Sequence, residues 1–410
     1  MTVDALPVPR FRALAHDRYR LEIVDRATVF DLDRVRRERG ALHGELVVSC
    51  GLPGTRSADG VLFAGNFGLS SIRDRKELAG HLTTRSQASD VDWLGNVEEL
   101  CQGVIAAERT GQPAILLRDV PRPGPSEMFS VGGMPLLARH PMILFGDGGD
   151  AKSYLALWLA GQLAENGIRV LYVDWEFSAD DHRDRLERLF GETMPDVLYA
   201  RAERPMTAEA DRLRRIVREE NVGYIVADSV AFAADGPPEA AEVAAGYFRA
   251  LRSLGVGSLS IAHTTKAENG DAKPFGSTFW HNGARSTWYV KRSAETGESA
   301  IAIGLFNRKA NTGPLSRPLG YSIAFSEDRT TFERVDVADV ADLAARLTVR
   351  QRMVGLLRAG AMSMVDIAAE LDTEMNTVVQ TVKRGEGKVF VRVPGPDGIY
   401  RIGLAERTAA

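Results

Sequence analysis

The chain has 410 residues, 44% of them hydrophobic, and these values indicate a globular protein of roughly two to four domains. The net charge is only −4, which excludes a strongly basic protein that coats nucleic acid with its whole surface. Two cysteines are too few for a disulfide framework or a thiolate metal site. No run approaches the about 18 apolar residues of a membrane helix, and the N-terminus lacks the apolar middle of a signal peptide, so we expect a cytoplasmic protein without membrane contact.

Proline and glycine divide the chain into three regions, and the clearest break is VPRPGPSE at residues 120–127. We expect an α+β domain of unknown role in residues 1–125. Residues 131–340 alternate β-branched apolar runs with amphipathic helices, which predicts an α/β domain with a mostly parallel sheet covered on both faces. A smaller domain is expected in residues 346–405.

In the N-terminal region, the run FDLDRVRRERGAL has the charge pattern of a helix, and GELVVSCGL and GVLFAGNF have that of strands. A further helix is expected near WLGNVEELCQGVIAAE. The arginine-rich run contains no chemical motif. We interpret it as a solvated helix face, with contact to phosphates as the alternative. Its arginines are Arg34, Arg36, Arg37 and Arg39.

In the central region, the predicted strands are MILFG, IRVLYVD, VGYIVAD, GSLSIAH, RSTWYV and AIAIGLF. Helices are expected between them. Their predicted ranges are Lys152 to Glu165, Asp180 to Phe190, Ala208 to Glu220 and Pro238 to Leu254.

The stretch ILFGDGGDAKSYLALWLAG, residues 143–161, has the form of a phosphate-binding loop between a strand and a helix. In such a loop, backbone N–H groups face the phosphates and the helix N-terminus adds its positive dipole end. Lys152 would reach the β- and γ-phosphates of ATP, and Ser153 would place its hydroxyl on Mg²⁺. A glycine-rich turn with a surface lysine is the alternative, but it leaves the Lys-Ser pair unexplained. The predicted nucleotide-binding residues are Gly146, Asp147, Gly148, Gly149, Asp150, Ala151, Lys152, Ser153 and Tyr154.

Two residues of this loop depart from what a triphosphate site favours. Ala151 stands where the motif has its last glycine, and we expect it in a right-handed backbone that adds only modest crowding. Asp150 brings a carboxylate beside the phosphates, so we expect it to point outward or to meet a partner subunit.

Acidic side chains follow the next two predicted strands. Asp174 and Glu176 come after IRVLYVD, and Glu176 is the candidate base that orients and deprotonates the attacking water. The alternative is that both acids cap the following helix, although Ser178 is the better cap. Asp228 ends VGYIVAD, as a Walker B acid does, and we assign Ser153, Asp228 and Asp174 to the Mg²⁺ site.

A histidine ends the fourth predicted strand. His263 follows the run SLSIA, and a polar group at this strand end can sense the γ-phosphate and move the segment after it. A purely structural histidine is the alternative.

The order of these parts, followed by PFGSTFWHNGARSTWYV and FNRKANTGP, resembles the RecA-like ATPases, in particular the plasmid RepA type of hexameric replicative helicase. The resemblance covers about Met134 to Phe325. It implies a homo-oligomer, a hexameric ring or a filament, in which ATP lies between subunits and a neighbour completes the site. Arg285 falls where that family carries its arginine finger, and Lys309 corresponds to a second cation that acts on the neighbour's nucleotide.

The resemblance also implies contact with DNA. The stretch from Thr264 to Phe275 corresponds to the loop that faces the central channel, where Lys266 and Lys273 would touch the phosphates of a single strand. Two departures from the family are Ala151 and the absence of aromatic residues between Thr264 and Lys273.

The last seventy residues have the order of three short helices and a hairpin with the turn PGPDG, and they resemble a winged helix. Polar outward positions of the third helix are suited to base edges and phosphates. Acids nearby, including Glu370 and Asp372, leave a protein-binding role as the alternative. The candidate DNA-binding residues are Gln380, Lys383, Arg384 and Lys388, with Asn376 and Arg392 beside them.

Together these features predict an oligomeric, Mg²⁺-dependent ATPase that acts on DNA as a replicative-type helicase, with replication or recombination proteins as partners. Two alternatives remain. One is a RecA-like recombination or helicase-loading ATPase that does not unwind DNA. The other is a nucleotide-gated assembly protein with slow hydrolysis and with the tail as an adaptor.

Overall fold

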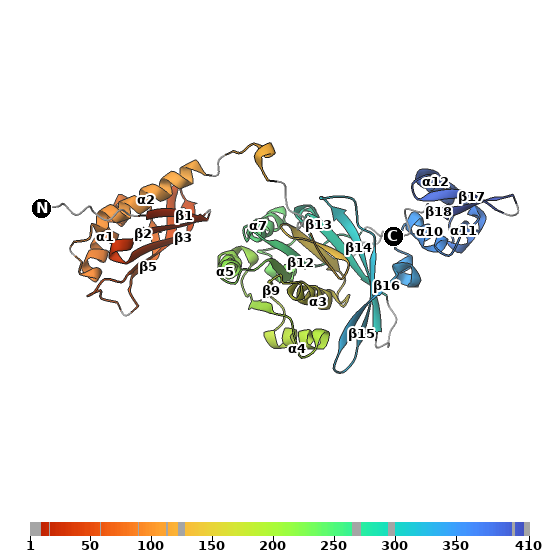
Figure 1. The fold of residues 1–410 in the computed structure, drawn as a ribbon, viewed down its shortest axis with the longest axis horizontal. Coiled ribbons are helices and arrows are strands. Elements are labelled where there is room, and N and C mark those ends of the chain that lie inside the picture. The colour runs from red at the N-terminus through yellow and green to blue at the C-terminus, as the bar shows by residue number, and fades with distance from the viewer. Residues whose placement is uncertain are drawn as a thin grey trace. The chain divides into compact units, whose positions relative to one another are not determined.

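The computed structural model describes residues 10–15, 17–57, 59–88, 90–111, 114–121, 128–264, 272–293, 300–395 and 398–405. The chain divides into two compact units, Met1–Arg122 and Pro123–Ala410 (Figure 1). Among the described residues, no helix combines the length and the apolar composition needed to span a membrane.

The first unit is an antiparallel meander packed against two helices (Figure 1). Its strands occur in the order β1 to β5 and alternate between buried and more exposed residues, so that one face of the sheet contributes Phe30, Leu32 and Leu46 to a core completed by Trp93. The elements are β1 (Arg10–Ala15), β2 (Arg18–Ile23), β3 (Thr28–Glu38), β4 (Ala41–Cys50), β5 (Val61–Gly68), α1 (Ile72–Ser86) and α2 (Trp93–Thr110).

The arginine-rich run in this unit is a β-hairpin, so the prediction of a helix there was wrong. Phe30 and Leu32 are buried with less buried residues between them, which is the period of two of a strand. The turn between β3 and β4 has Arg39 at φ 50° and Gly40 at φ 88°. Arg34 forms an ion pair with Glu45 across the sheet and Arg36 one with Glu38 along its own strand, so a solvated helix face does not exist here.

The second unit contains a nine-stranded sheet in the order β10-β9-β11-β12-β8-β13-β14-β15-β16. The strands from β10 to β13 in this order are parallel, and the last three are antiparallel. The six predicted strands are all present, and β10, β15 and β16 extend the sheet at its two ends. The strands are β8 (Pro141–Gly146), β9 (Val170–Asp174), β10 (Val197–Arg201), β11 (Tyr224–Asp228), β12 (Gly257–His263), β13 (Ser286–Arg292), β14 (Ala300–Ala310), β15 (Leu319–Phe325) and β16 (Thr330–Val335).

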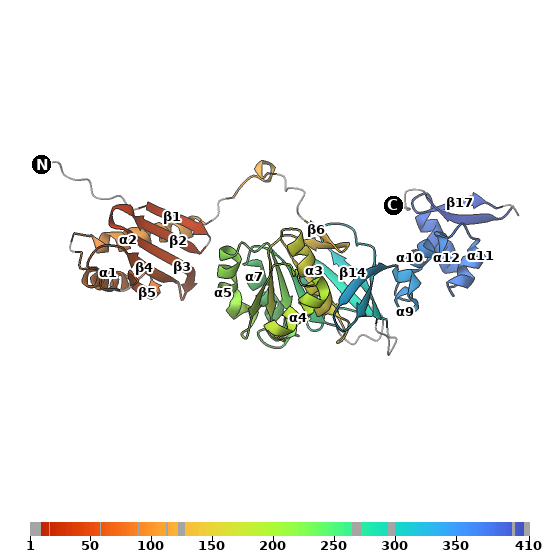
Figure 2. The same cartoon turned by 60° about the horizontal axis from the view of Figure 1, so that its bottom comes forward.

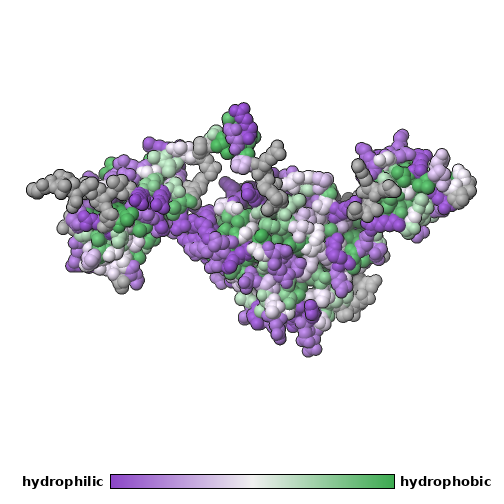
Figure 3. Space-filling view, viewed as in Figure 1, coloured by the Kyte–Doolittle hydropathy of each residue, from purple (hydrophilic) through white to green (hydrophobic). Residues whose placement is uncertain are grey.

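Helices cover both faces of this sheet, as predicted for an α/β domain with a mostly parallel sheet (Figure 2). One core contains the apolar side chains of α3 and α4, and a second core on the other face contains those of α5, α7 and α8. The helices are α3 (Lys152–Glu165), α4 (Ala179–Phe190), α5 (Met206–Glu219), α6 (Val230–Ala233), α7 (Ala241–Arg252) and α8 (Thr278–Gly283). A short hairpin, β6 (Met128–Val131) and β7 (Met134–Leu137), precedes β8. Hydrophilic residues gather on the surface near α5 (Figure 3).

The C-terminal segment has the predicted order of three helices and a hairpin. Met353, Ile367, Val378 and Phe390 form its small core. The elements are α9 (Ala341–Ala344), α10 (Val349–Leu357), α11 (Met364–Glu370), α12 (Met375–Gly385), β17 (Phe390–Pro394) and β18 (Tyr400–Leu404).

Candidate nucleotide-binding site

The phosphate-binding loop joins the end of β8 to the start of α3, at the carboxyl edge of the parallel strands. Gly146 is required by packing, because a Cβ at this position would lie 2.6 Å from the Val290 carbonyl oxygen. Gly149 has a φ of 80°, in the region that favours glycine. The glycines therefore shape the loop in two ways, by close approach and by backbone freedom.

Ala151 adopts a left-handed backbone, with φ 57° and ψ 24°, so the expectation of a right-handed conformation was wrong. The last glycine of the motif supplies this conformation freely, whereas the Cβ of an alanine there costs about 1–2 kcal/mol. Ala151 packs against the core below α3 and directly precedes the helix. The strain is thus held by the surrounding fold.

Asp150 and Lys152 are both buried, with 4% and 6% of their surface exposed. The Lys152 Nζ donates to the Asp147 carbonyl oxygen at 2.6 Å, and the Asp147 N–H donates to Asp150 Oδ2 at 2.8 Å. Asp150 therefore points into its own loop, which corrects the expectation that it points outward or toward a partner. Burial raises the pKa of Asp150, and burial lowers the pKa of Lys152 while the neighbouring acids oppose that change.

Ser153 and Asp228 provide the oxygen pair expected for Mg²⁺. Asp228 ends β11 with 1% of its surface exposed, and it accepts a hydrogen bond from Tyr172 Oη at 2.7 Å. Burial raises the pKa of Asp228, although Tyr172 and the nearby Ser153 hydroxyl lower it in part. The described residues contain no group of three or more His, Cys, Asp or Glu that could hold a metal. This pair suits Mg²⁺ because Mg²⁺ at such sites keeps several waters and takes its other ligands from phosphates.

Asp174 holds a loop in place, and its carboxylate is not in the pocket. The side chain is fully buried, and it accepts the backbone N–H groups of Glu176 and Phe177 and the Tyr199 hydroxyl at 3.0 Å. Burial raises the pKa of Asp174, but the contact with His182 and the two backbone N–H groups outweigh it, so the pKa is lowered overall. The geometry thus departs from the assignment of Asp174 to the metal, because its acceptor positions serve the segment that carries Glu176.

Glu176 is exposed and lines the same pocket as Lys152 and Ser153. The Ser229 hydroxyl donates a short hydrogen bond to its carboxylate. The following helix, α4, is capped by Ser178 in a capping box with Asp181, so Glu176 is not needed as a helix cap. Besides accepting the Ser229 hydrogen bond, its carboxylate can therefore interact with a ligand in the pocket.

His263 is the last residue of β12, and it is exposed and lines this pocket. Its carbonyl oxygen accepts the N–H of Phe275, and the N–H of Thr264 donates to Gly146 at the start of the phosphate-binding loop. The end of β12 is therefore tied both to the phosphate loop and to the segment beyond it.

The pocket has a volume of about 540 Å³, and several of its residues were not identified from the sequence. The Arg185 guanidinium lies over the rings of Phe177 at 4.4 Å and Tyr154 at 5.0 Å, and Tyr154 meets Phe325 edge to face. These side chains come from α3, the segment before α4, α4 itself and β15, and they offer flat surfaces for a nucleotide base. No motif in the sequence marks them, because only the fold brings these segments together. The unidentified pocket residues are Phe177, Arg185, Ile261, Arg292, Ile301 and Phe325.

Arg285 and Lys309 lie at the opposite edge of the sheet. The N–H of Arg285 donates to Pro141 at the start of β8, whereas the phosphate loop follows the end of β8, so Arg285 does not enter its own pocket. Its side chain is exposed. Lys309 Nζ donates to the carbonyl oxygens of His281, Asn282 and Ala284 at 2.8–2.9 Å and supports the segment before Arg285.

Three basic side chains, Arg252, Arg285 and Lys309, influence one another at this edge. Burial lowers the pKa of Lys309, and the charges of Arg285 and Arg252 lower it further. Arg252, which the sequence did not single out, donates to the Gly283 carbonyl oxygen at 2.6 Å. This edge is therefore suited to an anion, and in this structure Lys309 holds the exposed Arg285 segment rather than reaching outward itself.

The predicted DNA-binding residues fall into two groups. Lys266 lies outside the described residues, and the carbonyl of Lys273 accepts a hydrogen bond from the Thr264 hydroxyl at 3.2 Å. In the tail, the residues predicted on α12 and at its end are exposed; they are Asn376, Gln380, Lys383, Arg384 and Lys388. Arg392 forms an ion pair with Glu386 at 2.8 Å.

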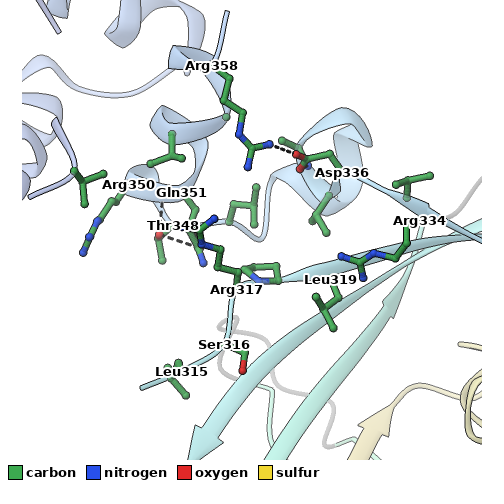
Figure 4. A pocket seen from close by; sticks show the side chains of 18 residues that line it. Leu315, Ser316, Arg317, Leu319, Arg334, Asp336, Thr348, Arg350, Gln351 and Arg358 are labelled. Atoms are coloured by element: carbon green, nitrogen blue, oxygen red, sulfur yellow. Dashed lines mark hydrogen bonds and ion pairs between the residues drawn. The ribbon is translucent and has the colours of Figure 1, made fainter. Parts of the chain in front are cut away.

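A second cavity, of about 840 Å³, lies away from the phosphate loop (Figure 4). Residues of β16 and α10 line it, and Arg358 closes one side through an ion pair with Asp336. It is larger than the pocket at the phosphate loop but contains none of the residues predicted for catalysis. Chemistry therefore favours the smaller pocket as the nucleotide site.

Asp228→Asn is expected to stabilise the nucleotide-free protein and to abolish its stabilisation by MgATP. Because the folded pKa of Asp228 is raised, its charge opposes folding above the ordinary carboxyl pKa, and the gain from Asn should be largest near pH 8 and shrink as the pH falls toward that pKa. A rise of a few degrees in melting temperature is expected, as about 1 kcal/mol gives in a domain of this size. Thermal unfolding with and without MgATP measures both effects. The exposed Asp180→Asn is the control, and an unchanged MgATP shift in Asp228→Asn would remove this residue from the metal site.

Comparison with known proteins places the central domain among ATPases. Residues 131–269 match the AAA domain family. The DNA repair protein RadA of Halalkalibacterium halodurans is 28% identical over 146 residues, which are 34% of this chain and 31% of that protein, so the chain spans about a third of this curated relative. A KaiC-like protein, PH0186, of Pyrococcus horikoshii OT3 aligns with a TM-score of 0.39 and 17% identity over 49% of this chain and 92% of that one. The ATPase domain of G40P aligns with a TM-score of 0.39 and 13% identity over 48% and 85%. Residues 131–269 thus match the AAA domain family, within a domain whose mostly parallel sheet has helices on both faces.

Proposed function

We propose that this protein is a Mg²⁺-dependent ATP hydrolase that works on DNA as a homo-oligomer, with a replicative-type helicase as the first candidate. The observation that carries the proposal is the grouping of Lys152, the Ser153–Asp228 pair and Glu176 around one pocket at the carboxyl edge of the sheet. A lysine for the phosphates, oxygens for Mg²⁺ and a carboxylate for water are the parts that phosphoryl transfer to water requires.

Each residue has a role that follows from its contacts. Lys152 would exchange the Asp147 carbonyl for the β- and γ-phosphate oxygens, and Ser153 and Asp228 would hold Mg²⁺, which supplies positive charge to the triphosphate. Glu176 would orient the attacking water and accept its proton, while Asp174 and Ser229 keep the Glu176 segment and carboxylate in position. His263 would report the γ-phosphate to the segment after β12.

Completion of the site by a neighbour is the second part of the proposal. Arg285 is exposed at the sheet edge opposite to the phosphate loop of its own chain, beside Arg252 and Lys309. A ring or filament places such an edge against the pocket of the next subunit, and a guanidinium there stabilises charge in the transition state. A hexameric ring is the arrangement that the RepA-type resemblance favours.

DNA contact is the third part. Phe275 and Phe279 have 47% and 50% of their surface exposed, and they follow the stretch from Thr264 to Lys273, which has no aromatic residue of its own. Exposed rings near lysines such as Lys273 suit a single strand, whose bases stack and whose phosphates are anionic. The exposed polar face of α12 would add a second contact.

A recombination or helicase-loading ATPase is the second candidate, and the similarity to the DNA repair protein RadA favours it. Such a protein assembles on DNA with nucleotide but does not separate strands. Displacement of a labelled strand from a forked duplex distinguishes the two. The strained Ala151 favours slow turnover and hence the third alternative, a nucleotide-gated assembly protein. Stimulation of hydrolysis by single-stranded DNA would argue against it.

Glu176→Gln is expected to lower ATP turnover by at least about 100-fold, in line with the loss of a general base, with little change in MgATP affinity. The amide keeps the size of the side chain and still accepts the Ser229 hydrogen bond. Phosphate release and equilibrium binding of MgATP measure the two quantities, with Asp180→Asn as the matched control on α4. Turnover within about threefold of the wild type would refute the assignment of the base.

Two inactive variants, Arg285→Ala and Lys152→Ala, are expected to regain ATPase activity when mixed. Arg285→Ala keeps an intact pocket and Lys152→Ala keeps an intact arginine, so mixed assemblies contain sites with both groups. Random mixing of equal amounts should restore about a quarter of the wild-type rate per subunit, since one interface in four combines both intact parts. Activity that stays at the level of the separate variants while mass measurement shows mixed assemblies would place Arg285 outside the neighbour's site.

Phe275→Ala is expected to weaken single-stranded DNA binding by about tenfold, as the loss of one stacked base does, and to reduce DNA-stimulated hydrolysis without altering the basal rate. Phe275→Tyr keeps the ring and should behave like the wild type. The control is Phe232→Ala, which removes another exposed phenylalanine, on α6. Equal binding by Phe275→Ala and the wild type would exclude this ring from the DNA site.

A further inference from the structure

The phosphate loop is closed by a contact that the sequence motif does not contain. Asp147 is bound through both of its backbone groups, because its N–H donates to Asp150 Oδ2 at 2.8 Å and its carbonyl accepts from Lys152 Nζ at 2.6 Å and from the Asp150 N–H at 3.3 Å. The Asp150 carboxylate lies against the backbone of Gly146, since a Cβ there would be 2.9 Å from Oδ2. The carboxylate is thus built into the inside of the loop.

This contact spans the loop immediately before its strained residue. Ala151, at φ 57°, lies between Asp150 and Lys152, and both of these hold Asp147. A non-glycine residue stays in such a conformation only when its surroundings determine it strongly. Without nucleotide, both bonds fix the chain around Ala151. The bond from the Asp147 N–H to Asp150 is the one that would remain once Lys152 turns to the phosphates, so Asp150 would provide that determination in the loaded loop.

We propose that Asp150 is a positioning residue for nucleotide binding, which keeps the phosphate loop in its binding shape and so compensates for the glycine that Ala151 replaces. The inference rests on the proposed nucleotide site and goes beyond it, because it assigns a role to a carboxylate that otherwise only repels phosphate. The loop of this chain is held by a side chain where the general motif relies on backbone freedom.

The positive charge of Lys291 offsets the negative charges of Asp147 and Asp150 beside an anionic ligand. Its Nζ lies 3.5 Å from Asp147 Oδ2, and its charge also acts on the Asp150 carboxylate together with that of Lys152. Two lysines therefore face the two acids of the loop. The hydrogen bond between Asp147 and Asp150 therefore adds no net negative charge beside the phosphates.

The test is a cycle of Asp150→Ala and Ala151→Gly, with the dissociation constant of MgATP measured by titration calorimetry. Asp150→Ala should weaken binding about tenfold, since releasing the loop exposes the cost of a left-handed alanine. Glycine at position 151 removes that cost, so the double variant should return to within about threefold of the wild type. Asp150→Asn keeps an acceptor oxygen for the Asp147 N–H and should also bind MgATP within about threefold of the wild type.

Several outcomes would overturn the inference. Unchanged or tighter binding by Asp150→Ala would show that the carboxylate does not support the site, and additive effects in the double variant would show that its role is unrelated to Ala151. Thermal unfolding without nucleotide checks that each variant is folded. If Asp150→Ala does not fold, Asp150→Ser replaces it and the same rescue by Ala151→Gly is required. A wild-type protein that does not bind MgATP would refute the proposed function itself, which is a separate result.

Discussion

Parallel pairing of the central strands is the constraint on which the site depends. Because β9, β11, β12 and β8 run side by side in the same direction, the residues that follow their ends meet at one edge of the sheet. Glu176, Asp228 and His263 reach the pocket of Lys152 for this reason, although they are far apart in the sequence. The two helical layers bury both faces of the sheet and keep the strand ends in register.

Buried charge is concentrated where this edge meets the phosphate loop. Asp150, Lys152 and Asp228 are nearly inaccessible, and burial shifts the pKa of each toward the neutral form. Such groups are costly in a protein without ligand. In the proposed function, a triphosphate with Mg²⁺ would supply charges that offset this cost, so the same residues that weaken the empty fold would favour the loaded one. The left-handed Ala151 adds a backbone cost at the same place.

The sequence predicted the central fold well because its signals are local and strong. Continuous apolar runs such as residues 142–146 mark buried parallel strands, and all six predicted strands and the four long helices are present. The N-terminal arginine run was misread because alternating charges fit either period, and only the pairing of β3 with β4 shows the burial of Phe30 and Leu32. The strands β10, β15 and β16 were missed because they lie toward the ends of the sheet, where the apolar pattern is weaker.

By itself, the sequence determined the chemistry of the site: a glycine-rich loop with Lys152 and Ser153, and acids at two strand ends. These residue types can be read from a motif, since phosphate and Mg²⁺ require particular atoms at fixed spacing from a strand and a helix. Only the tertiary structure decided which atoms face the pocket. It turned Asp174 toward Tyr199 and the backbone, drew Asp150 into its own loop and brought Arg185 over Tyr154. The direction of a side chain depends on neighbours distant in sequence, and no local pattern contains them.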